Sequence, residues 1–215
     1  TIISDDGVPW PLISLKNFDR LEIFGNNITA GAGVMNTRLA RFAEENSLSG
    51  LEFVFGIPST VGGLVRMNAG AFGREINDVL VSCEILTPAG EVELLKPKMS
   101  YRFSEIDGIV LSATFVLDYL ESHEISSEIK RLTALRMEKQ PQEPSCGSVF
   151  KAHQNESAAK FIEATGLKGM RIGGAQISPK HCNFIVNLGG ATTKDFMELC
   201  EKVEETVYYE FGIKL

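Results

Sequence analysis

The sequence predicts an α+β protein, in which a strand-rich first part precedes a smaller part that mixes helices and strands. Up to about residue 120, short apolar runs alternate with glycines and other turn residues, a pattern typical of strands. After residue 120, apolar residues recur at helical spacing instead. A polar stretch at 121–124 separates the two textures, so we expect one domain at 1–120 and a second at 126–215.

In the first part, apolar runs predict strands at 12–15, 21–24, 28–30, 79–87, 92–95 and 109–117. Pro88-Ala89-Gly90-Glu91 separates two of these runs and is a hairpin signature. One helix is expected after 28–30, capped by Asn36 or Thr37.

In the second part, apolar spacing from Ile125 predicts a helix of about fifteen residues, broken at Gln140-Pro141. A short helix at 161–164 should be closed by Gly166. A strand is expected at 183–187, and a final helix should follow a cap at Thr192 or Thr193.

Composition narrows the functional classes. The chain has 215 residues and a net charge of −7, which argues against nucleic acid as the main partner but not against a small anionic ligand. The four cysteines form no Cys-x-x-Cys pair, so free thiols in a reducing compartment are expected rather than a disulfide framework or zinc site. No apolar run reaches the ~18 residues of a membrane span. The three histidines are far apart and do not predict a metal site.

The most unusual part of the chain is glycine-rich. It reads Gly56-Ile57-Pro58-Ser59-Thr60-Val61-Gly62-Gly63 and then Asn68-Ala69-Gly70-Ala71-Phe72-Gly73. Glycines let a backbone approach a ligand closely, and a helix starting near Thr60 would direct free N–H groups outward, so the stretch predicts a phosphate site. The spacing is neither a Rossmann fingerprint nor a P-loop, and by itself it is also consistent with a structural turn.

Further motifs accompany this stretch. They are Gly50-Leu51-Glu52-Phe53, Tyr101-Arg102, Pro144-Ser145-Cys146-Gly147-Ser148-Val149-Phe150-Lys151, Gly166-Leu167-Lys168-Gly169, Arg171-Ile172-Gly173-Gly174-Ala175-Gln176 and Asn183-Phe184-Ile185-Val186-Asn187. In this order the chain resembles UDP-N-acetylenolpyruvoylglucosamine reductases over nearly its whole length. The resemblance implies an FAD-binding domain of the vanillyl-alcohol oxidase (PCMH) type, followed by a smaller α/β substrate-binding domain. It also implies that the natural protein extends beyond both ends of this chain.

The resemblance implies a cytoplasmic flavoenzyme. It would use FAD and NADPH to reduce UDP-N-acetylenolpyruvoylglucosamine to UDP-N-acetylmuramate for peptidoglycan synthesis. The small-molecule substrate is the expected partner, without nucleic acid or membrane, and the protein is expected to be a monomer.

Individual roles also follow from the resemblance. Arg102 would stabilise the negative charge that develops on the substrate, and Ser148 would act as general acid, although each residue alone is typical of a surface or a turn. Lys151 and His181 would contact the substrate, His181 near its UDP part. The residues expected to line the FAD site are Gly56, Ile57, Pro58, Ser59, Thr60, Gly62, Gly63, Asn68, Gly70 and Ile109. Since Arg102 and Ser148 lie on opposite sides of the expected boundary, the active site is expected in a cleft between the domains.

Some positions depart from the family pattern. Ser59 replaces a more usual glycine, Phe72 a more usual tyrosine, and Lys151-Ala152-His153 a more usual Lys-Asn-Pro. The family's Gly-Ser-Asn loop for FAD phosphate is expected before Thr1, and its third catalytic residue, a glutamate, after Leu215.

Two other functions fit parts of this pattern. One is an FAD oxidase of the same fold, against which the Gly-Ser-x-Phe-Lys and Arg-Ile-Gly-Gly-Ala-Gln motifs argue. The other is a non-catalytic module that binds a UDP-sugar or nucleotide, which the missing FAD loop and glutamate would favour for this fragment.

Overall fold

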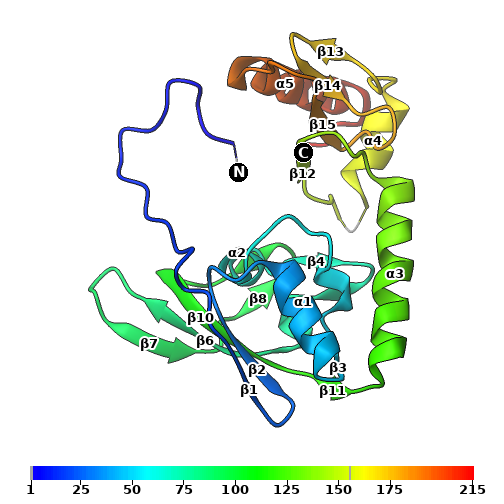
Figure 1. The fold of residues 1–215 in the computed structure, drawn as a ribbon. Coiled ribbons are helices and arrows are strands. Elements are labelled where there is room, and N and C mark those ends of the chain that lie inside the picture. The colour runs from blue at the N-terminus through cyan, green and yellow to red at the C-terminus, as the bar shows by residue number, and fades with distance from the viewer. Residues whose placement is uncertain (1, 155) are drawn as a thin grey trace. The chain divides into compact units, whose positions relative to one another are not determined.

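The computed structural model describes residues 2–154 and 156–215, and its mixture of helices and strands confirms the α+β class (Figure 1). By their contacts, residues 13–136 form one compact unit, here called the first unit. Residues 137–215, together with the segment up to Leu12, form the second unit. Helix α3, Ser122–Lys139, belongs to the first unit as far as Arg136. The functional boundary expected between residues 119 and 126 stays a prediction.

A five-stranded antiparallel sheet organises the first unit, with the strand order β1-β2-β10-β6-β7. Its strands are β1 Leu21–Phe24, β2 Asn27–Gly31, β6 Leu80–Leu86, β7 Val92–Leu95 and β10 Ile109–Val116. Alternate residues such as Ile28, Ile85 and Phe115 are buried, whereas Thr29 and Thr114 share a 2.9 Å hydrogen bond on the other face. One face of the sheet therefore forms the core and the other is polar.

Two helices and a short 3-10 turn cover the apolar face. They are α1 Asn36–Glu45, α2 Val61–Arg66 and η1 Glu52–Val54. Helix α2 packs against β2 and β10, and α1 lies beside it in Figure 1. Leu39, Phe53, Leu64 and Phe115 are almost completely buried in this core. Each such side chain contributes about 1.5–3 kcal/mol on burial.

Three short two-stranded ladders complete the first unit. They are β3 Leu48–Ser49 with β11 Asp118–Tyr119, β4 Gly70–Ala71 with β5 Arg74–Glu75, and β8 Met99–Ser100 with β9 Phe103–Ser104. The 3-10 turn η2, Ile76–Asp78, follows β5. The glycine-rich stretch leads into β4, and the turn between β8 and β9 holds Tyr101 and Arg102, so two ladders carry predicted site residues.

The second unit has its own sheet and core. An antiparallel sheet has the order β12-β15-β14-β13, with strands β12 Ser145–Ser148, β15 Phe184–Asn187, β14 Ala175–Ile177 and β13 Arg171–Ile172. Helices α4 Ala158–Ala164 and α5 Thr193–Phe211 pack against each other, and α5 also packs on the sheet. Their shared core includes Ile162, Ile177, Leu199, Val203 and Val207.

Helix α5 begins with a reciprocal cap. Thr192 Oγ1 accepts from the Asp195 N–H at 3.1 Å, and Asp195 Oδ2 accepts from the Thr192 N–H at 3.0 Å. The same carboxylate accepts from the Gly174 N–H at 3.2 Å, and these backbone donors lower the pKa of Asp195. At the far end, Gly212 is left-handed with φ 67°, and its N–H donates to Tyr208 O at 2.8 Å. Both helix ends therefore have partners for groups that the helix itself leaves unpaired.

Most predicted elements are confirmed. Strands form at 21–24 and around 28–30, the hairpin pairs β6 with β7, and strands follow at 109–116 and 184–187. Helix α3 ends before Gln140, α4 ends before Gly166, and α5 begins after Thr192.

Two predictions about local structure are wrong. Residues 12–15 are not a strand, because they pair with no other strand in the described part; Leu12 and Ile13 are largely exposed. The cap of α1 is Met35, since Asn36 turns inward and donates to Val54 O. Thr37 is already inside the helix.

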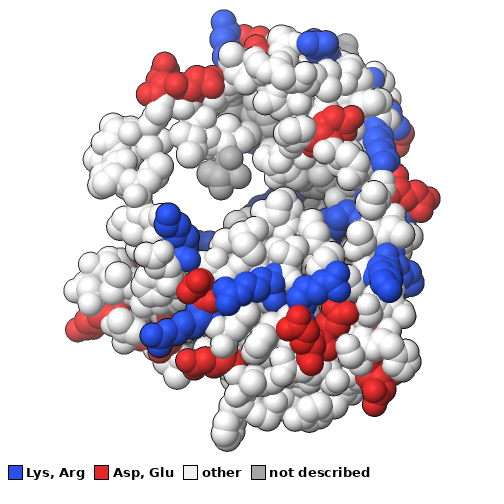
Figure 2. Space-filling model, in the orientation of Figure 1, with Lys and Arg blue, Asp and Glu red and all other residues white. Residues whose placement is uncertain are grey.

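The distribution of surface charge and the length of the helices are relevant to binding of nucleic acid and membranes. On the face that Figure 2 shows, basic and acidic side chains lie close to one another rather than segregated by sign. Ion pairs such as Arg41–Glu44 at 2.6 Å and Arg74–Asp78 at 3.5 Å join side chains of opposite charge. No helix in the described residues is both long and apolar enough to cross a bilayer.

Candidate functional site

The start of the glycine-rich stretch pairs with the loop that follows β2. Thr60 forms a bridge with Met35, and the N–H groups of Val61 and Gly62 donate to Val34 O and Ala32 O, each at 2.9 Å. These two N–H groups are therefore satisfied within the protein. The prediction that the start of α2 directs free N–H groups at a phosphate is wrong for them.

Close packing explains several of the glycines. A Cβ on Gly63 would lie 2.5 Å from Ser59 Oγ, and one on Gly62 would lie 3.1 Å from the Ala32 Cβ. Gly56 has φ 84°, and a Cβ there would lie 3.2 Å from Arg136 Cδ. The Thr60 hydroxyl does not cap α2, while the Ser59 hydroxyl donates to Thr60 O at 3.1 Å. Gly56 and Pro58 are exposed at the surface of this segment.

Asn68 joins the glycine-rich stretch to the β8–β9 turn. Its side chain is fully buried, with Nδ2 donating to Ser100 O at 2.9 Å and Oδ1 accepting from the Asn77 N–H at 3.0 Å. Both ends of the amide therefore bind backbone groups. The left-handed φ of 39° at Asn68 is one that asparagine tolerates better than most residues. The expected contact of Asn68 with a cofactor stays a prediction. In the structure its side chain links the backbone at Ser100 to the backbone at Asn77.

Arg102 lies directly beside this segment. Its Nη2 donates to Gly70 O at 2.6 Å and its Nη1 to Asn68 O at 3.4 Å. The guanidinium carbon also sits 5.0 Å from the centre of the Tyr101 ring. Arg102 itself has φ 54°, which costs a non-glycine residue roughly 1–2 kcal/mol. The structure thus brings together Arg102, which the resemblance assigned to the substrate's charge, and Asn68 and Gly70, which were expected at the FAD site.

Ser148 lies at the end of strand β12. It faces Phe184 in the ladder with β15, and the register shifts between Ser145 and Ser148. Gly147 has φ 87° in this irregular stretch. A Gly-Ser pair alone is typical of a turn, but here these residues form a bulged strand. Cys146, in the same strand, is exposed.

His181 and Asn183 lie on the neighbouring loop before β15. The His181 ring meets the Phe184 ring edge-on at 4.8 Å, and its Nδ1 accepts from the Asn183 N–H at 3.3 Å. Burial is the main cause that lowers the pKa of His181, which favours the neutral ring that can accept this bond. The Asn183 side chain binds the backbone of Phe150, next to the exposed Lys151. Ser148, Lys151 and His181 are thus gathered around β12 and β15.

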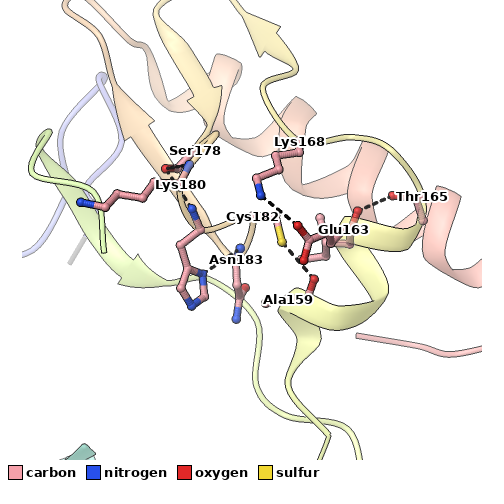
Figure 3. A network of polar contacts seen from close by, with 10 residues as sticks. Ala159, Glu163, Thr165, Lys168, Ser178, Lys180, Cys182 and Asn183 are labelled. Carbon is pink, nitrogen blue, oxygen red and sulfur yellow. Dashed lines mark hydrogen bonds and ion pairs between the residues drawn. The ribbon is translucent and has the colours of Figure 1, made fainter. Parts of the chain in front are cut away.

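A polar network involves the loop that carries Cys182 and Asn183 (Figure 3). Lys168 Nζ donates to Glu163 Oε1 at 2.8 Å, and the Cys182 thiol contacts Ala159 O at 2.9 Å. Ser178 Oγ accepts from the N–H groups of Lys180 and His181 at 3.1 and 3.3 Å. The Cys182 contact fastens the loop from 178 to 183 to helix α4, and the Ser178 bonds hold the turn of the loop itself. Together they fix the positions of His181 and Asn183.

Other predicted residues lie apart from these two clusters. Ile109 begins β10 opposite Leu86 and is 39% exposed. A cavity of about 310 Å³ in the second unit is lined by Cys146, Asn187, Thr192 and Phe196 among others, and one of about 410 Å³ in the first unit by Arg20, Glu22, Glu84 and Ser112 among others. No predicted site residue lines either cavity. Among the described residues no group of three or more His, Cys, Asp or Glu side chains could hold a metal ion.

Sequence reasoning overlooked Asn183 as an individual residue. It appeared only as the first residue of an expected strand, where its burial and its bonds were not evident. The one available signal was a polar amide directly before an apolar run, because buried amides are usually hydrogen-bonded.

Comparisons with known proteins agree across both units. Residues 5–96 match a family model described as an FAD binding domain, and residues 140–215 match one described as the C-terminal domain of UDP-N-acetylenolpyruvoylglucosamine reductase. A relative of that name from Listeria innocua is 46% identical over the whole chain, which covers 74% of that protein. One from Latilactobacillus sakei is 45% identical over the whole chain and 73% of its own length. A crystal structure of the Thermus caldophilus reductase aligns with a TM-score of 0.81 and 36% identity, covering 88% of this chain and 71% of that one.

Proposed function

This chain belongs to the UDP-N-acetylenolpyruvoylglucosamine reductase family, and we propose that its residues bind FAD and UDP-N-acetylenolpyruvoylglucosamine and reduce that substrate to UDP-N-acetylmuramate. NADPH is the reductant, and the product serves peptidoglycan synthesis. The observation that carries this proposal is the family match over both halves of the chain at 46% identity. All four cysteines are free, which supports a reducing cytoplasmic location.

The first unit offers surfaces that fit FAD. Two methionines lie beside the glycine-rich segment: Met35 forms the bridge with Thr60, and Met67 directly precedes Asn68. Their side chains are 48% and 47% exposed. Such apolar side chains suit a flat ring system, while the Thr60 hydroxyl suits phosphate or ribose oxygens. We therefore assign FAD binding to Gly56–Gly63, Asn68–Gly70 and Ile109. When bound, FAD supplies hydride transfer from NADPH to the methylene carbon of the enolpyruvyl group.

Arg102 is assigned the charge that this reduction creates. As the methylene carbon gains hydride, the adjacent carbon becomes electron-rich and shares its charge with the substrate carboxylate. A guanidinium has five N–H donors, and the two bonds to Gly70 O and Asn68 O leave others for that carboxylate. Because the carbonyls hold the guanidinium before substrate arrives, little reorganisation is needed at the moment of reaction.

Ser148 is assigned the final proton. Its hydroxyl is exposed at the end of β12 and can donate to the electron-rich carbon, which restores a neutral C–H bond. Lys151 and His181 would contact the substrate beside it, with His181 near the UDP part. Lys151 is exposed and offers a positive charge suited to diphosphate.

Rapid kinetics of the two half-reactions tests the role of Ser148. In the full-length flavoenzyme, Ser148→Ala should leave flavin reduction by NADPH nearly unchanged, since no proton reaches the substrate in that half. It should slow flavin reoxidation by the enolpyruvyl substrate at least ~10²-fold, the low end for a lost general acid. Ser148→Cys should restore part of the rate, because a thiol also donates a proton. Equal losses in both half-reactions would contradict the assignment.

A further inference from the structure

The side chain of Asn183 takes the place of a strand partner. It is 5% exposed, its Oδ1 accepts from the Phe150 N–H at 2.9 Å, and its Nδ2 donates to Phe150 O at 2.9 Å. Its backbone carbonyl accepts from the Val149 N–H at 2.9 Å. Asn183 thus satisfies three backbone groups of the two residues that follow Ser148: the N–H of Val149 and both the N–H and C=O of Phe150.

The strand needs such support at this point. Its register is broken between Ser145 and Ser148, and Gly147 is left-handed, so the regular ladder cannot by itself determine the direction of the chain after Ser148. The pairing with Phe184 and the three bonds to Asn183 hold the segment 148–150 to the start of β15.

We propose that Asn183 is a positioning residue, which holds the backbone of Val149 and Phe150 and thereby fixes where the Ser148 hydroxyl points. This inference rests on the proposed function, in which Ser148 is the general acid. Asn183 itself touches no reacting atom. It acts through Ser148, and a misplacement of about 1 Å in such a group lowers the rate by up to ~10²-fold.

The chemistry of the amide makes the proposal specific. An asparagine presents one acceptor and one donor side by side, which matches the N–H and C=O of a single residue. An ionised aspartate retains the acceptor but directs a second oxygen at Phe150 O. A protonated aspartic acid restores the donor, so acid should recover what Asn183→Asp loses.

The main experiment measures both half-reactions in full-length flavoenzyme with Asn183→Asp and Asn183→Ala. We expect flavin reduction by NADPH to stay within about twofold of the unsubstituted enzyme and flavin reoxidation by the enolpyruvyl substrate to fall by roughly 10-fold to 10²-fold. The deficit of Asn183→Asp, measured against the unsubstituted enzyme at the same pH, should shrink as the pH falls. A deficit that does not change with pH, or an equal loss in both half-reactions, overturns the proposal.

A matched control comes from the other end of β15. Asn187 is also an asparagine whose side chain binds backbone, because its Oδ1 accepts from the N–H groups of Gly189 and Ala191 at 2.8 and 3.2 Å. Asn187→Ala should leave flavin reoxidation within about twofold, because it removes bonds of the same kind away from Ser148. A loss as large as that of Asn183→Ala would show a general weakening of the strand and overturn the proposal.

Two further measurements separate this inference from the function beneath it. In the Asn183→Ala variant without substrate, amide hydrogen exchange should become faster at Val149 and Phe150. Unchanged exchange would overturn the proposal that Asn183 holds this backbone. If Ser148→Ala alone leaves reoxidation intact, the proposed role of Ser148 fails first. If Ser148→Ala is slow and Asn183→Ala is slow, adding Asn183→Ala to Ser148→Ala should cost less than about twofold more, whereas additive losses refute action through Ser148.

Discussion

Arg102 and Ser148 each lie next to a buried asparagine, but Arg102 is held through its side chain and Ser148 through its backbone. In the first unit, Asn68 fastens the β8–β9 turn, and carbonyls of Asn68 and Gly70 bind the guanidinium itself. In the second unit, Asn183 binds the two residues after Ser148 and leaves its hydroxyl exposed. The difference suits their proposed tasks, since a charge must be preorganised whereas a hydroxyl must rotate to deliver a proton.

The largest expected effect comes from removing the side-chain attachment at Arg102. Arg102→Met should slow flavin reoxidation by the substrate roughly 10²–10³-fold, comparable to losing a preorganised donor. Arg102→Lys should recover only a small part, because an ammonium cannot reach both carbonyls and a carboxylate in the same way. Stopped-flow absorbance of the flavin gives both rates. Full activity in Arg102→Lys would mean that charge alone matters and that the carbonyl attachment does not.

Two alanine substitutions compare how tightly the surroundings of Arg102 and of Ser148 are packed. A Cβ on Gly70 would lie 2.5 Å from Arg74 O and 3.0 Å from Arg102 Nη1, whereas a Cβ on Gly147 would meet nothing within 4 Å. Gly70→Ala should therefore destabilise the fold by roughly 1–3 kcal/mol through overpacking and also displace the guanidinium. Gly147→Ala should cost roughly 1–2 kcal/mol through its left-handed backbone alone.

Denaturant unfolding measures both stabilities, and stopped-flow kinetics shows whether catalysis follows. We expect Gly70→Ala to slow reoxidation as well as unfold more easily. If Gly70→Ala retains the full reoxidation rate, the guanidinium of Arg102 can work without the position that its 2.6 Å bond to Gly70 O now fixes.

The smallest expected effect concerns pH and the His181 ring, which packs against Phe184, the ladder partner of Ser148. Burial lowers the pKa of His181 in the folded protein, so below about pH 6.5 the unfolded chain binds the proton more readily. Stability should therefore fall as the pH drops through that value, and His181→Gln should weaken this dependence. Denaturant midpoints between pH 8 and pH 5 give the comparison. Parallel curves for the two proteins would contradict a buried, neutral His181.

The surroundings of Arg102 could be predicted from the sequence more fully than those of Ser148. The family resemblance pointed to Arg102, and glycine density together with the resemblance pointed to Asn68 and Gly70; these residues do lie together. Free N–H groups at Val61 and Gly62 were also expected, but pairing with the loop at 32–35 depends on tertiary structure that local residue types do not reveal. Around Ser148, the bulge and the bonds to Asn183 join residues more than thirty positions apart, so no local pattern could show them.

The cap of helix α5 has a consequence for how sequences of this kind diverge. Gly173 has φ 51°, and a Cβ there would lie 2.3–2.5 Å from the Asp195 carboxyl atoms. The same carboxylate binds the N–H groups of Gly174 and Thr192. A lineage that gains a side chain at position 173 must therefore lose or move the aspartate, and losing it leaves two backbone groups unpaired. Positions 173 and 195 should consequently covary, and part of the Arg-Ile-Gly-Gly-Ala-Gln signature records a helix cap rather than a ligand.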